Sequence, residues 1–419
     1  DKLKADELSS TLLVRYIAQG TLWKMGNMFQ LSVELYDTKD KRVVWSDRWQ
    51  EKWDNLPMIK DSLSDGLLTA LDTKPKIEKK IETTNAEAYE FYLKAKHKYA
   101  KRGDTDDIEI VRGLLNKAIE LDDNLIVAKV LLGSTYAHIG DYDKAMEIFT
   151  SALKQAEELG YKREIGDILN RIGNVYYFNQ WDNDKTLDYY IRSLKINEEI
   201  DDKNGMGWSL NNIGNIYAVK GDYDKSLDYH THSLKTYNDI NAKFGMMFCL
   251  FDIGRDVYTN TGDYNNALDY ITRSLDICKE FGNKHMMGWI FKSIGCVYYN
   301  KGEHKKAEEY LEKSLSIQKE IGLKEGDLLF TTTTYLYLTY KHLGKEYDIK
   351  EIHALIKDTE NIAFDLNLRL YELLEDKSYL ETAYTQVQEK ATAMEDEYKA
   401  KFLSYPIPKA IVEEWEKVK

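Results

Sequence analysis

Residues 211–227 read NNIGNIYAVKGDYDKSL, and near-copies of this stretch recur along the chain. Each copy contains a glycine at the same position, which we call the marker glycine: Gly133, Gly173, Gly214, Gly254 and Gly295. The intervals between them are 40, 41, 40 and 41 residues. A fixed period of this length predicts a solenoid of stacked units. Each copy then passes through a polar turn into a second apolar segment, so we expect the unit to be a pair of helices.

Apolar residues recur on one face of the first helix of each pair. They lie four before, one before and three after the marker glycine, as in Leu210, Ile213 and Tyr217. Steps of three and four place residues on the same side of a helix, so we expect this face to be buried. Glycine destabilises a helix interior by roughly 1 kcal/mol relative to alanine. We therefore expect the marker glycine to permit close approach of the neighbouring helix backbone.

The opposite face of the first helix carries amides, aromatic rings and charges, where a solvated face would carry Glu and Lys. Ten residues at these positions form the candidate partner-binding groove: Asn170, Asn174, Trp208, Asn211, Asn215, Phe248, Phe251, Arg255, Trp289 and Lys292. A side-chain amide both donates and accepts hydrogen bonds, and half-open aromatics are common binding hot spots. The alternative is that the asparagines and tryptophans only pack between helices or face solvent.

These patterns resemble the tetratricopeptide repeat family over roughly residues 85–345. The family's small-large-small signature appears in one copy as Gly214, Tyr217, Ser226, His230 and Ser233. The longer period is similar to the variety found in kinesin light chain and in bacterial signalling proteins. The resemblance implies a mainly α-helical superhelix whose concave groove binds a protein or an extended peptide segment.

Composition restricts the function classes. The chain has 419 residues and a net charge of -13, which argues against nucleic acid as a partner, since nucleic-acid binders carry a basic stripe. No apolar run approaches the roughly 18 residues of a membrane helix, so we expect no membrane insertion. The three cysteines, at positions 249, 278 and 296, lie inside helical patterns without a CxxC pair. A reducing cytoplasm is the simplest explanation.

Catalytic and metal-binding patterns are weak throughout. His230 and His232 are two residues apart and would point to different sides of a helix, so we expect no metal site there. The sequence contains neither HExxH nor a glycine-rich phosphate loop. We therefore predict that this chain is not an enzyme and has no cofactor.

Residues 1–74 do not fit the repeat. Residues 12–25, 29–36 and 43–49 are rich in β-branched and aromatic residues and are separated by turn residues, which predicts a three-stranded antiparallel meander. A helix is expected over residues 57–71, with Pro57 in its first turn. We expect this small α/β domain to lack its beginning, and residues 75–84 to form a linker.

This first segment also resembles the TolB-like domain attached to bacterial class III adenylate or guanylate cyclases. The resemblance rests on the short runs at residues 14–16, 20–21, 26–27, 31–37 and 44–46 and on the helix near Pro57. In such proteins a catalytic domain precedes this domain, and a tetratricopeptide array follows it. The resemblance implies that an enzyme upstream of this chain is regulated.

The repeats are predicted to form an array of about six or seven helix pairs over residues 85–356, and residues 357–419 a helical cap. Two copies carry one extra residue, between Gly173 and Thr186 and between Gly254 and Ala267; we expect strain or a bulge in those turns. The four threonines at 331–334 are poor helix formers and suggest a buried helix. Repeat arrays need a cap to cover the last apolar face.

Together these features predict a non-enzymatic, cytoplasmic protein- or peptide-binding module. Our leading hypothesis is the regulatory region of a bacterial multidomain signalling protein such as a cyclase. The alternatives are a stand-alone assembly scaffold and a receptor for short signalling peptides. Homodimerisation, the identity of the partner and the sign of regulation stay open.

Overall fold

The computed structural model describes residues 16–52, 83, 85–100, 105–180, 182–323, 326–357, 359, 361–394 and 396–419, together with the single positions 59, 63, 67 and 71. The chain divides into two compact units, Asp1–Asp202 (unit 1) and Lys203–Lys419 (unit 2). The helix expected over residues 57–71 and the linker expected at 75–84 lie almost entirely outside the described residues.

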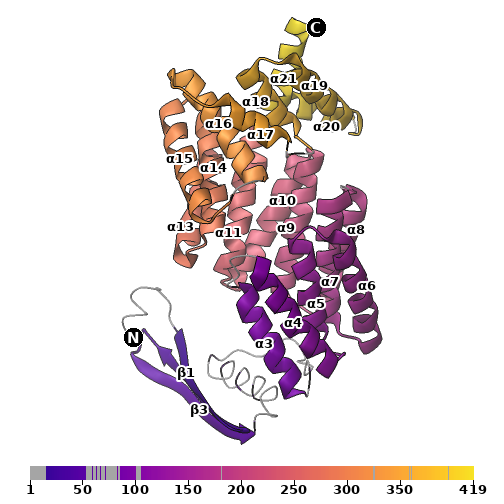
Figure 1. Ribbon diagram of the computed structural model, residues 1–419, viewed down its shortest axis with the longest axis vertical. Helices are drawn as coiled ribbons and strands as arrows, with labels where there is room; N and C mark the ends of the chain where they lie inside the picture. Colours follow the sequence, from indigo (N-terminus) through magenta and orange to yellow (C-terminus); the bar gives the residue numbers. More distant parts are fainter. Residues whose placement is uncertain are drawn as a thin grey trace. The chain divides into compact units, whose positions relative to one another are not determined.

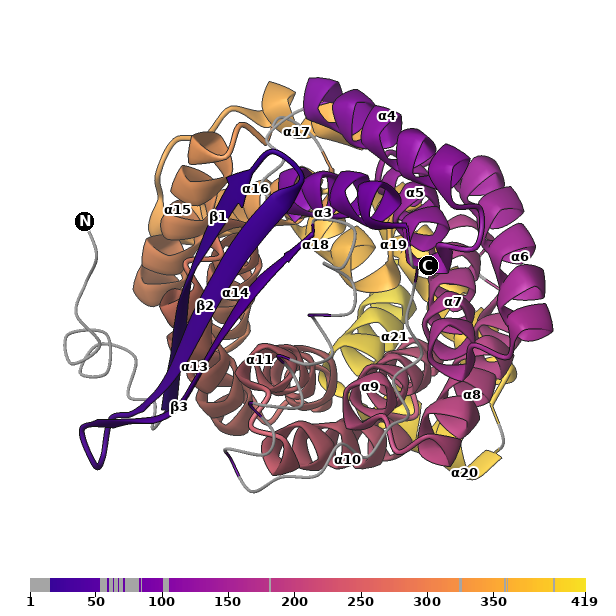
Figure 2. The same ribbon diagram turned by 90° about the horizontal axis from the view of Figure 1, so that it is seen from below.

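Unit 1 contains a three-stranded antiparallel sheet in the order β1-β2-β3 (Figure 2). Its strands are β1 (Tyr16–Met25), β2 (Met28–Asp37) and β3 (Arg42–Lys52). Gly26 has φ of 59° in the tight turn that joins β1 to β2, a conformation that glycine adopts without strain. Phe29, Val33 and Leu35 of β2 are buried. The predicted meander is confirmed over the described residues.

Among its described residues, unit 1 also contains three helix pairs. They are α3 (Ala86–Ala100), α4 (Thr105–Leu121), α5 (Ile126–His138), α6 (Tyr142–Leu159), α7 (Lys162–Val175), the π-helix η2 (Tyr176–Gln180) and α8 (Asn183–Glu199). The aspartates that open α6 and α8 cap them, because Asp141 and Asp182 accept hydrogen bonds from backbone N–H groups of the first turn.

Unit 2 contains four more pairs and a helical cap, with α9 to α16 side by side in Figure 1. The pairs are α9 (Lys203–Lys220), α10 (Tyr223–Asp239), α11 (Lys243–Asp252), the π-helix η3 (Ile253–Tyr258), α12 (Thr259–Thr261), α13 (Tyr264–Phe281), α14 (Lys284–Asn300), α15 (His304–Glu320), α16 (Asp327–Leu343) and α17 (Ile349–Lys357). The cap is α18 (Phe364–Leu374), α19 (Lys377–Thr392), α20 (Asp396–Ser404) and α21 (Pro406–Val418). The predicted solenoid of helix pairs is confirmed.

Each marker glycine faces a large side chain of the second helix in its own pair. A Cβ added at Gly173 would lie 2.5 Å from Cε1 of Tyr190, and one at Gly214 would lie 2.8 Å from the ring of His230. The corresponding residues in the other three copies are Phe149, Ile271 and Leu311. The expectation of a backbone neighbour is therefore wrong in the first three copies, where the glycine makes room for a ring.

A serine adds a second link between the two helices of a pair. The hydroxyl of Ser193 donates to the backbone carbonyl of Gly166 at 2.7 Å, and that of Ser233 donates to the carbonyl of Gly207 at 2.7 Å. Ser274 and Ser314 donate in the same way to Met247 and Gly288. In all four copies the acceptor lies seven residues before the marker glycine, so one hydrogen bond sets the register of these four pairs.

The two copies with one extra residue contain the π-helices η2 and η3. A π-helix accommodates one more residue than an α-helix over the same length. Because the surplus residue is absorbed there, Gly173 still faces Tyr190 and Gly254 still faces Ile271. The expected irregularity exists, but it begins within the first helix and not in the turn.

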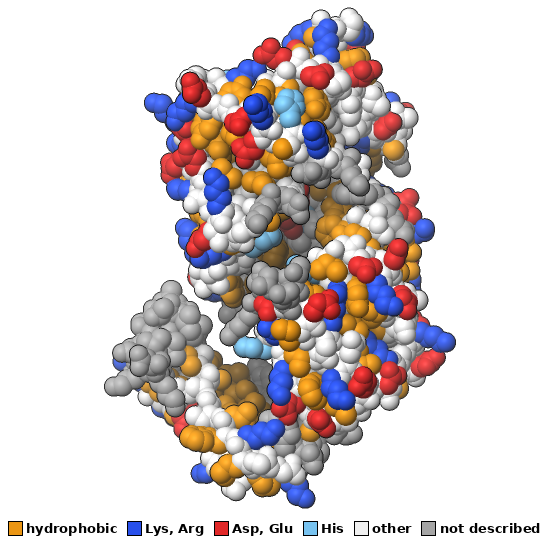
Figure 3. Space-filling view, in the orientation of Figure 1, with side chains coloured by type: hydrophobic (Ala, Val, Ile, Leu, Met, Phe, Trp, Pro, Cys, Tyr) orange, Lys and Arg blue, Asp and Glu red, His pale blue; other side chains and the backbone are white. Residues whose placement is uncertain are grey.

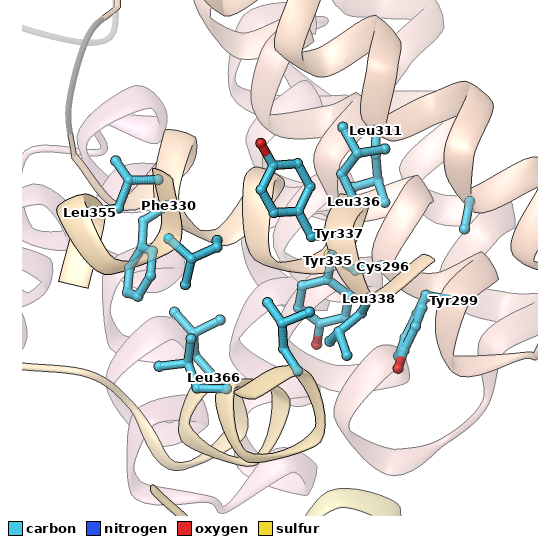
Figure 4. Packing of buried hydrophobic residues seen from close by; sticks show 14 residues of the cluster. Cys296, Tyr299, Leu311, Phe330, Tyr335, Leu336, Tyr337, Leu338, Leu355 and Leu366 are labelled. Carbon is cyan, nitrogen blue, oxygen red and sulfur yellow. The ribbon is translucent and has the colours of Figure 1, made fainter. Parts of the chain in front are cut away.

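The cap packs against more than the last helix pair. A core under α16 to α18 includes Leu311, Phe330, Tyr335, Leu336 and Leu366 (Figure 4). A second core joins Leu380, Ala383 and Val387 of α19 to residues of earlier pairs, namely Ala218, Tyr223 and Val257. The predicted burial of the threonine-rich helix is confirmed, since Thr332, Thr333 and Thr334 are at most 1% exposed.

Replacing Gly173 with alanine should destabilise the protein despite alanine's better helix propensity. The new methyl group would overlap the Tyr190 ring, and overpacking a core typically destabilises by about 1–3 kcal/mol. The control is Gly113→Ala in α4, where an added Cβ meets nothing within 4 Å; it should stabilise by about 1 kcal/mol. Urea denaturation of both variants measures the difference. Equal stabilisation by both changes would contradict the packing role of the marker glycine.

Candidate functional site

The ten candidate residues lie on the first helices of their pairs, in both units. Asn170 and Asn174 belong to α7 in unit 1, and the other eight belong to α9, α11, η3 and α14 in unit 2. The buried members are Asn170, Asn211, Phe251 and Lys292, and the half-buried members are Asn174, Trp208, Asn215, Phe248, Arg255 and Trp289. The buried four all lie three residues before a marker glycine.

In unit 1 the two asparagines link the first and second helices of one pair. Nδ2 of Asn170 donates to the hydroxyl of Ser193 at 2.8 Å. The hydroxyl of Tyr190 donates to Oδ1 of Asn174 at 2.6 Å. Both amides therefore contribute to packing, whatever else they bind.

In unit 2 the aromatic residues of neighbouring pairs come together. The rings of Trp208 and Phe248 have centroids 5.5 Å apart. Two cations lie over other rings of the same face, with Arg255 4.9 Å from the centre of Phe251 and the Lys292 ammonium 4.8 Å from that of Trp289. Such cation–π contacts are favourable in partly desolvated positions.

A buried hydrogen-bonded chain runs beside these rings. Nδ2 of Asn211 donates to Oδ2 of Asp252 at 2.8 Å, and Oδ1 of Asn211 lies 3.0 Å from Nδ1 of His230. Because the amide nitrogen is directed to the carboxylate, the amide oxygen accepts from His230, which assigns the imidazole proton to Nδ1. Asn211 is thus a bridge that holds Asp252 in place.

Arg255 completes this polar cluster, which we define as Asn211, His230, Asp252, Arg255 and Asp256. Arg255 lies 3.2 Å from Oδ1 of Asp252 and donates to both carboxylate oxygens of Asp256 at 2.6 Å. Its side chain is 34% exposed, whereas that of Asp252 is 8% exposed. The guanidinium is therefore the part of the cluster that a ligand could reach most easily.

Burial changes the protonation of the cluster. It raises the pKa of Asp252 to about 6; Arg255 opposes the shift and Asp256 adds to it. Burial also lowers the pKa of His230 to about 4, so this imidazole is neutral at pH 7. Near neutrality the cluster contains two carboxylates and one guanidinium, which makes it locally acidic.

The cluster surrounds the start of η3, to which Arg255 and Asp256 belong. The hydroxyl of Thr259 donates to the carbonyl of Gly254 at 2.8 Å and so satisfies a backbone group within the irregular turn. Residues in π-helices are frequently functional. The π-helix that absorbs the extra residue therefore lies at the polar cluster of the first-helix face.

Sequence reasoning missed Asp252, Asp256 and His230 as members of the site. Asp252 interrupts the apolar run Phe248–Cys–Leu–Phe–Asp–Ile253, and a carboxylate in such a run is costly to bury unless it is paired. That interruption is the signal that could have identified it. His230 was recognised only as a core position of the repeat.

The described residues offer few groups for covalent or metal chemistry. They contain no group of three or more His, Cys, Asp or Glu side chains that could hold a metal ion. The three cysteines are free and buried, and burial raises the pKa of Cys249 and Cys296 to about 12 and that of Cys278 to about 11. These thiols are protonated at neutral pH and thus weak nucleophiles. Within the same residues, no helix is long and apolar enough to cross a membrane.

Two family models, both described as tetratricopeptide repeat, match the chain. One covers residues 164–239 and 256–320, and the other covers residues 127–158. The chain contains tetratricopeptide repeats. The resemblance of residues 1–74 to a TolB-like domain stays a prediction, because the matched repeats begin after that segment.

Solved structures similar to this chain include a Rap protein complexed with Competence and Sporulation Factor. It has 15% sequence identity and a TM-score of 0.52, with 88% of this chain and 97% of that chain covered. A signal transduction ATPase with a tetratricopeptide repeat sensor from Pyrococcus horikoshii has 16% identity and a TM-score of 0.48, covering 83% and 48%. BtubC from P. vanneervenii has 19% identity and a TM-score of 0.41, covering 57% and 94%. No curated protein matches the chain in sequence.

Replacing Asp252 with asparagine should change how stability depends on pH. The folded-state pKa of Asp252, about 6, lies above the ordinary value of 3.8, so the folded protein favours the protonated carboxyl. The stabilisation that the protonated form gives is lost as pH rises from about 4 to about 6. Asparagine does not titrate and can still accept from Asn211. The Tm of the variant relative to the wild type should therefore rise by roughly 5 °C between pH 4 and pH 7.

The matched control for this pH series is Asp269→Asn, since Asp269 is 61% exposed on α13 of the same unit. Its Tm difference from the wild type should stay nearly constant over the same range. A Tm difference for Asp252→Asn that does not depend on pH would show that this carboxylate is not held in a desolvated position.

Proposed function

We propose that the chain is a non-enzymatic protein- or peptide-binding module, and that the first-helix face of unit 2 binds an extended peptide segment. The observation that carries this proposal is the juxtaposition of a prebuilt polar cluster with an aromatic pair. Asn211 donates a hydrogen bond to Asp252, the Arg255 side chain is 34% exposed, and Trp208 and Phe248 lie on the same face.

This arrangement suits a peptide chain for physical reasons. Side chains that are already held by the fold lose little entropy when a ligand binds. Half-buried aromatic rings can accept an apolar side chain, and Asn215 has a buried Oδ1 with no hydrogen-bond partner among the described residues. That oxygen could accept from a peptide N–H group. Structural similarity to a Rap protein, solved with Competence and Sporulation Factor, supports the same class of ligand.

The charges indicate what kind of peptide fits. Two carboxylates against one guanidinium favour a basic group at the cluster, either a Lys or Arg side chain or a peptide amino terminus. An apolar residue a few positions away would contact Trp208 and Phe248. On the face shown in Figure 3, Lys and Arg are interspersed with Asp and Glu in each unit, a distribution that supports a protein partner over nucleic acid.

The predicted residues of unit 2 then divide into two roles. We propose that the half-buried members touch the partner and that the buried members position them. The contacting residues are Trp208, Asn215, Phe248, Arg255 and Trp289, and the positioning residues are Asn211, Phe251 and Lys292. Asn170 and Asn174 belong to unit 1, where they link the two helices of their own pair.

The finer proposal is that this module is the cytoplasmic regulatory region of a bacterial signalling protein such as an adenylate or guanylate cyclase. It rests on the resemblance of residues 1–74 to a TolB-like domain and on the unpaired cysteines, which suit a reducing compartment. A full-length coding sequence without a cyclase, kinase or DNA-binding domain before Asp1 would rule this part out.

Two alternatives share the same fold. A receptor for short signalling peptides should bind them saturably and lose binding when the face is altered. A stand-alone scaffold should instead recover a protein partner and tolerate single changes on this face. Homodimerisation of the chain is tested by sedimentation and does not decide between them.

Peptides selected from a random 12-residue display library should depend on the face of unit 2. We expect Trp208→Ala and Asp256→Asn each to weaken binding at least tenfold by fluorescence anisotropy, since truncating a hot-spot residue typically removes more than about 1.4 kcal/mol. Trp23→Ala is the matched control, because Trp23 is 65% exposed on the sheet of unit 1. If no peptide is enriched, or if all three variants bind alike, the proposed site is wrong.

A further inference from the structure

Unit 2 has a second feature that the peptide-binding proposal does not use, a cavity of about 230 Å³. It is formed where α14, α15, α16, α18 and α21 meet. The lining residues that matter are Tyr299, His304, His342, Arg369, Ile407 and Ala410. His342 and Ala410 are exposed, so the cavity can be reached from solvent.

Two histidines form one wall. The rings of His304 and His342 are stacked with centroids 4.3 Å apart and planes within 5° of parallel. Nε2 of His342 lies 3.3 Å from the hydroxyl of Tyr299, whereas Nδ1 of His304 is buried and has no hydrogen-bond partner among the described residues. A buried polar atom without a partner is unfavourable.

Arg369 supplies the only formal charge among the six lining residues. It is 9% exposed and its donors are largely committed: Nη1 to both oxygens of Glu372 at 2.7 and 2.8 Å, Nη2 to Asn300 at 2.9 Å, and Nε to the Tyr335 hydroxyl at 3.4 Å. A guanidinium has five N–H groups. These contacts leave one Nη2–H for a ligand.

The charge balance determines which ligand the cavity can take. No Asp or Glu lines it, but the ion pair with Glu372 offsets the charge of Arg369, and the same carboxylate accepts from the Tyr299 hydroxyl at 3.3 Å. A dianion such as phosphate would therefore meet too little positive charge. A monoanion can accept from the remaining Nη2–H and from an imidazole N–H of the histidine pair, which carries a donor in either tautomer.

Another part of the lining is apolar. Ile407 and Ala410 belong to the first turns of α21, and Pro406 lies beside them. His304 opens α15, so the first turns of two helices contribute to the lining, and the partial positive charge of a helix start favours an anion. An anion with a short hydrocarbon part would contact both parts of the lining.

We propose that this cavity binds a monocarboxylate with a short apolar chain. The carboxylate is held by Arg369 and the histidine pair, and the hydrocarbon lies against Ile407 and Ala410. Two sources share this chemistry, a free small acid and the C-terminal carboxylate of a peptide that ends in an aliphatic residue. The site is separate from the polar cluster around Asp252 and does not depend on the proposed function of that cluster.

Sodium butyrate and its neutral isostere butyramide test the proposal directly. In the full chain at constant ionic strength, NMR signals of the His304 and His342 ring C–H groups should shift saturably with butyrate. Butyramide should bind at least tenfold more weakly, because it lacks the charge. Equal responses to the two compounds, or no response to butyrate, would overturn the proposal.

Two variants separate binding from folding. Ala410→Phe should fill the cavity and weaken butyrate binding at least tenfold, while the same change at Ala354, an exposed residue of α17, should leave it unchanged. Glu372→Gln removes the carboxylate that neutralises Arg369 and should tighten binding several-fold. Because a misfolded protein cannot bind more tightly, unchanged or weaker binding by Glu372→Gln counts against a carboxylate site.

The peptide acetyl-Ala-Ala-Val, as the free acid and as the C-terminal amide, distinguishes the two sources. Competition with butyrate by the acid but not by the amide identifies a peptide terminus as a ligand. Butyrate binding without competition by either peptide identifies a free small acid. Competition by the amide as strong as that by the acid would overturn the role of the carboxylate.

Discussion

The interlock between the two helices of each pair is the constraint on which the repeats depend. One large side chain of the second helix fills the space above a marker glycine, and an added Cβ at any of the five would lie between 2.5 and 2.8 Å from it. In four copies a serine hydroxyl also donates to a carbonyl of the first helix. The steric contact sets the distance between the helices, and the hydrogen bond sets their register.

This constraint explains why an insertion appears as a π-helix. If the extra residue after Gly254 had lengthened the α-helix, the following helix would have been displaced, and Ile271 and Ser274 would no longer face Gly254 and Met247. The π-helix Ile253–Tyr258 preserves both contacts. Arg255 and Asp256 lie within it, so a packing requirement also shapes the backbone that presents the polar cluster. The same inserted residue therefore produces the π-helix and positions part of the proposed binding site.

The sequence predicted the parts of the fold that depend on local periodicity. The 40- to 41-residue period, the buried apolar stripe and the meander are all properties of residues close together in the chain. The roles of the candidate residues depend on contacts between repeats. From sequence alone, Asn211 looks like an amide that binds a ligand. Its structural role is recognised only because its Nδ2 lies 2.8 Å from Oδ2 of Asp252, 41 residues later.

A second limit comes from how first helices are packed. A helix inside an array contacts the second helix of its own pair and also its neighbours, so more than one stripe is buried. The residue three before the marker glycine is at most 9% exposed in four copies, whether it is Asn, Phe or Lys. From sequence alone, the residues of a helix divide into an apolar face and a polar face. That division does not identify polar residues that are buried against a neighbouring helix.

The cap connects the two proposed sites within unit 2. Tyr405, Ile407 and Ile411 share one core with Tyr223 and with Val257 of η3, and Lys401 forms an ion pair with Asp224. Ile407 also lines the cavity, and Leu368 of the same core precedes Arg369 in the sequence. The helix α21, which lines the cavity, therefore shares a core with Val257 of the π-helix that carries Arg255. Because a densely packed core transmits displacements of its members, this shared core is the physical connection between the cavity and the polar cluster.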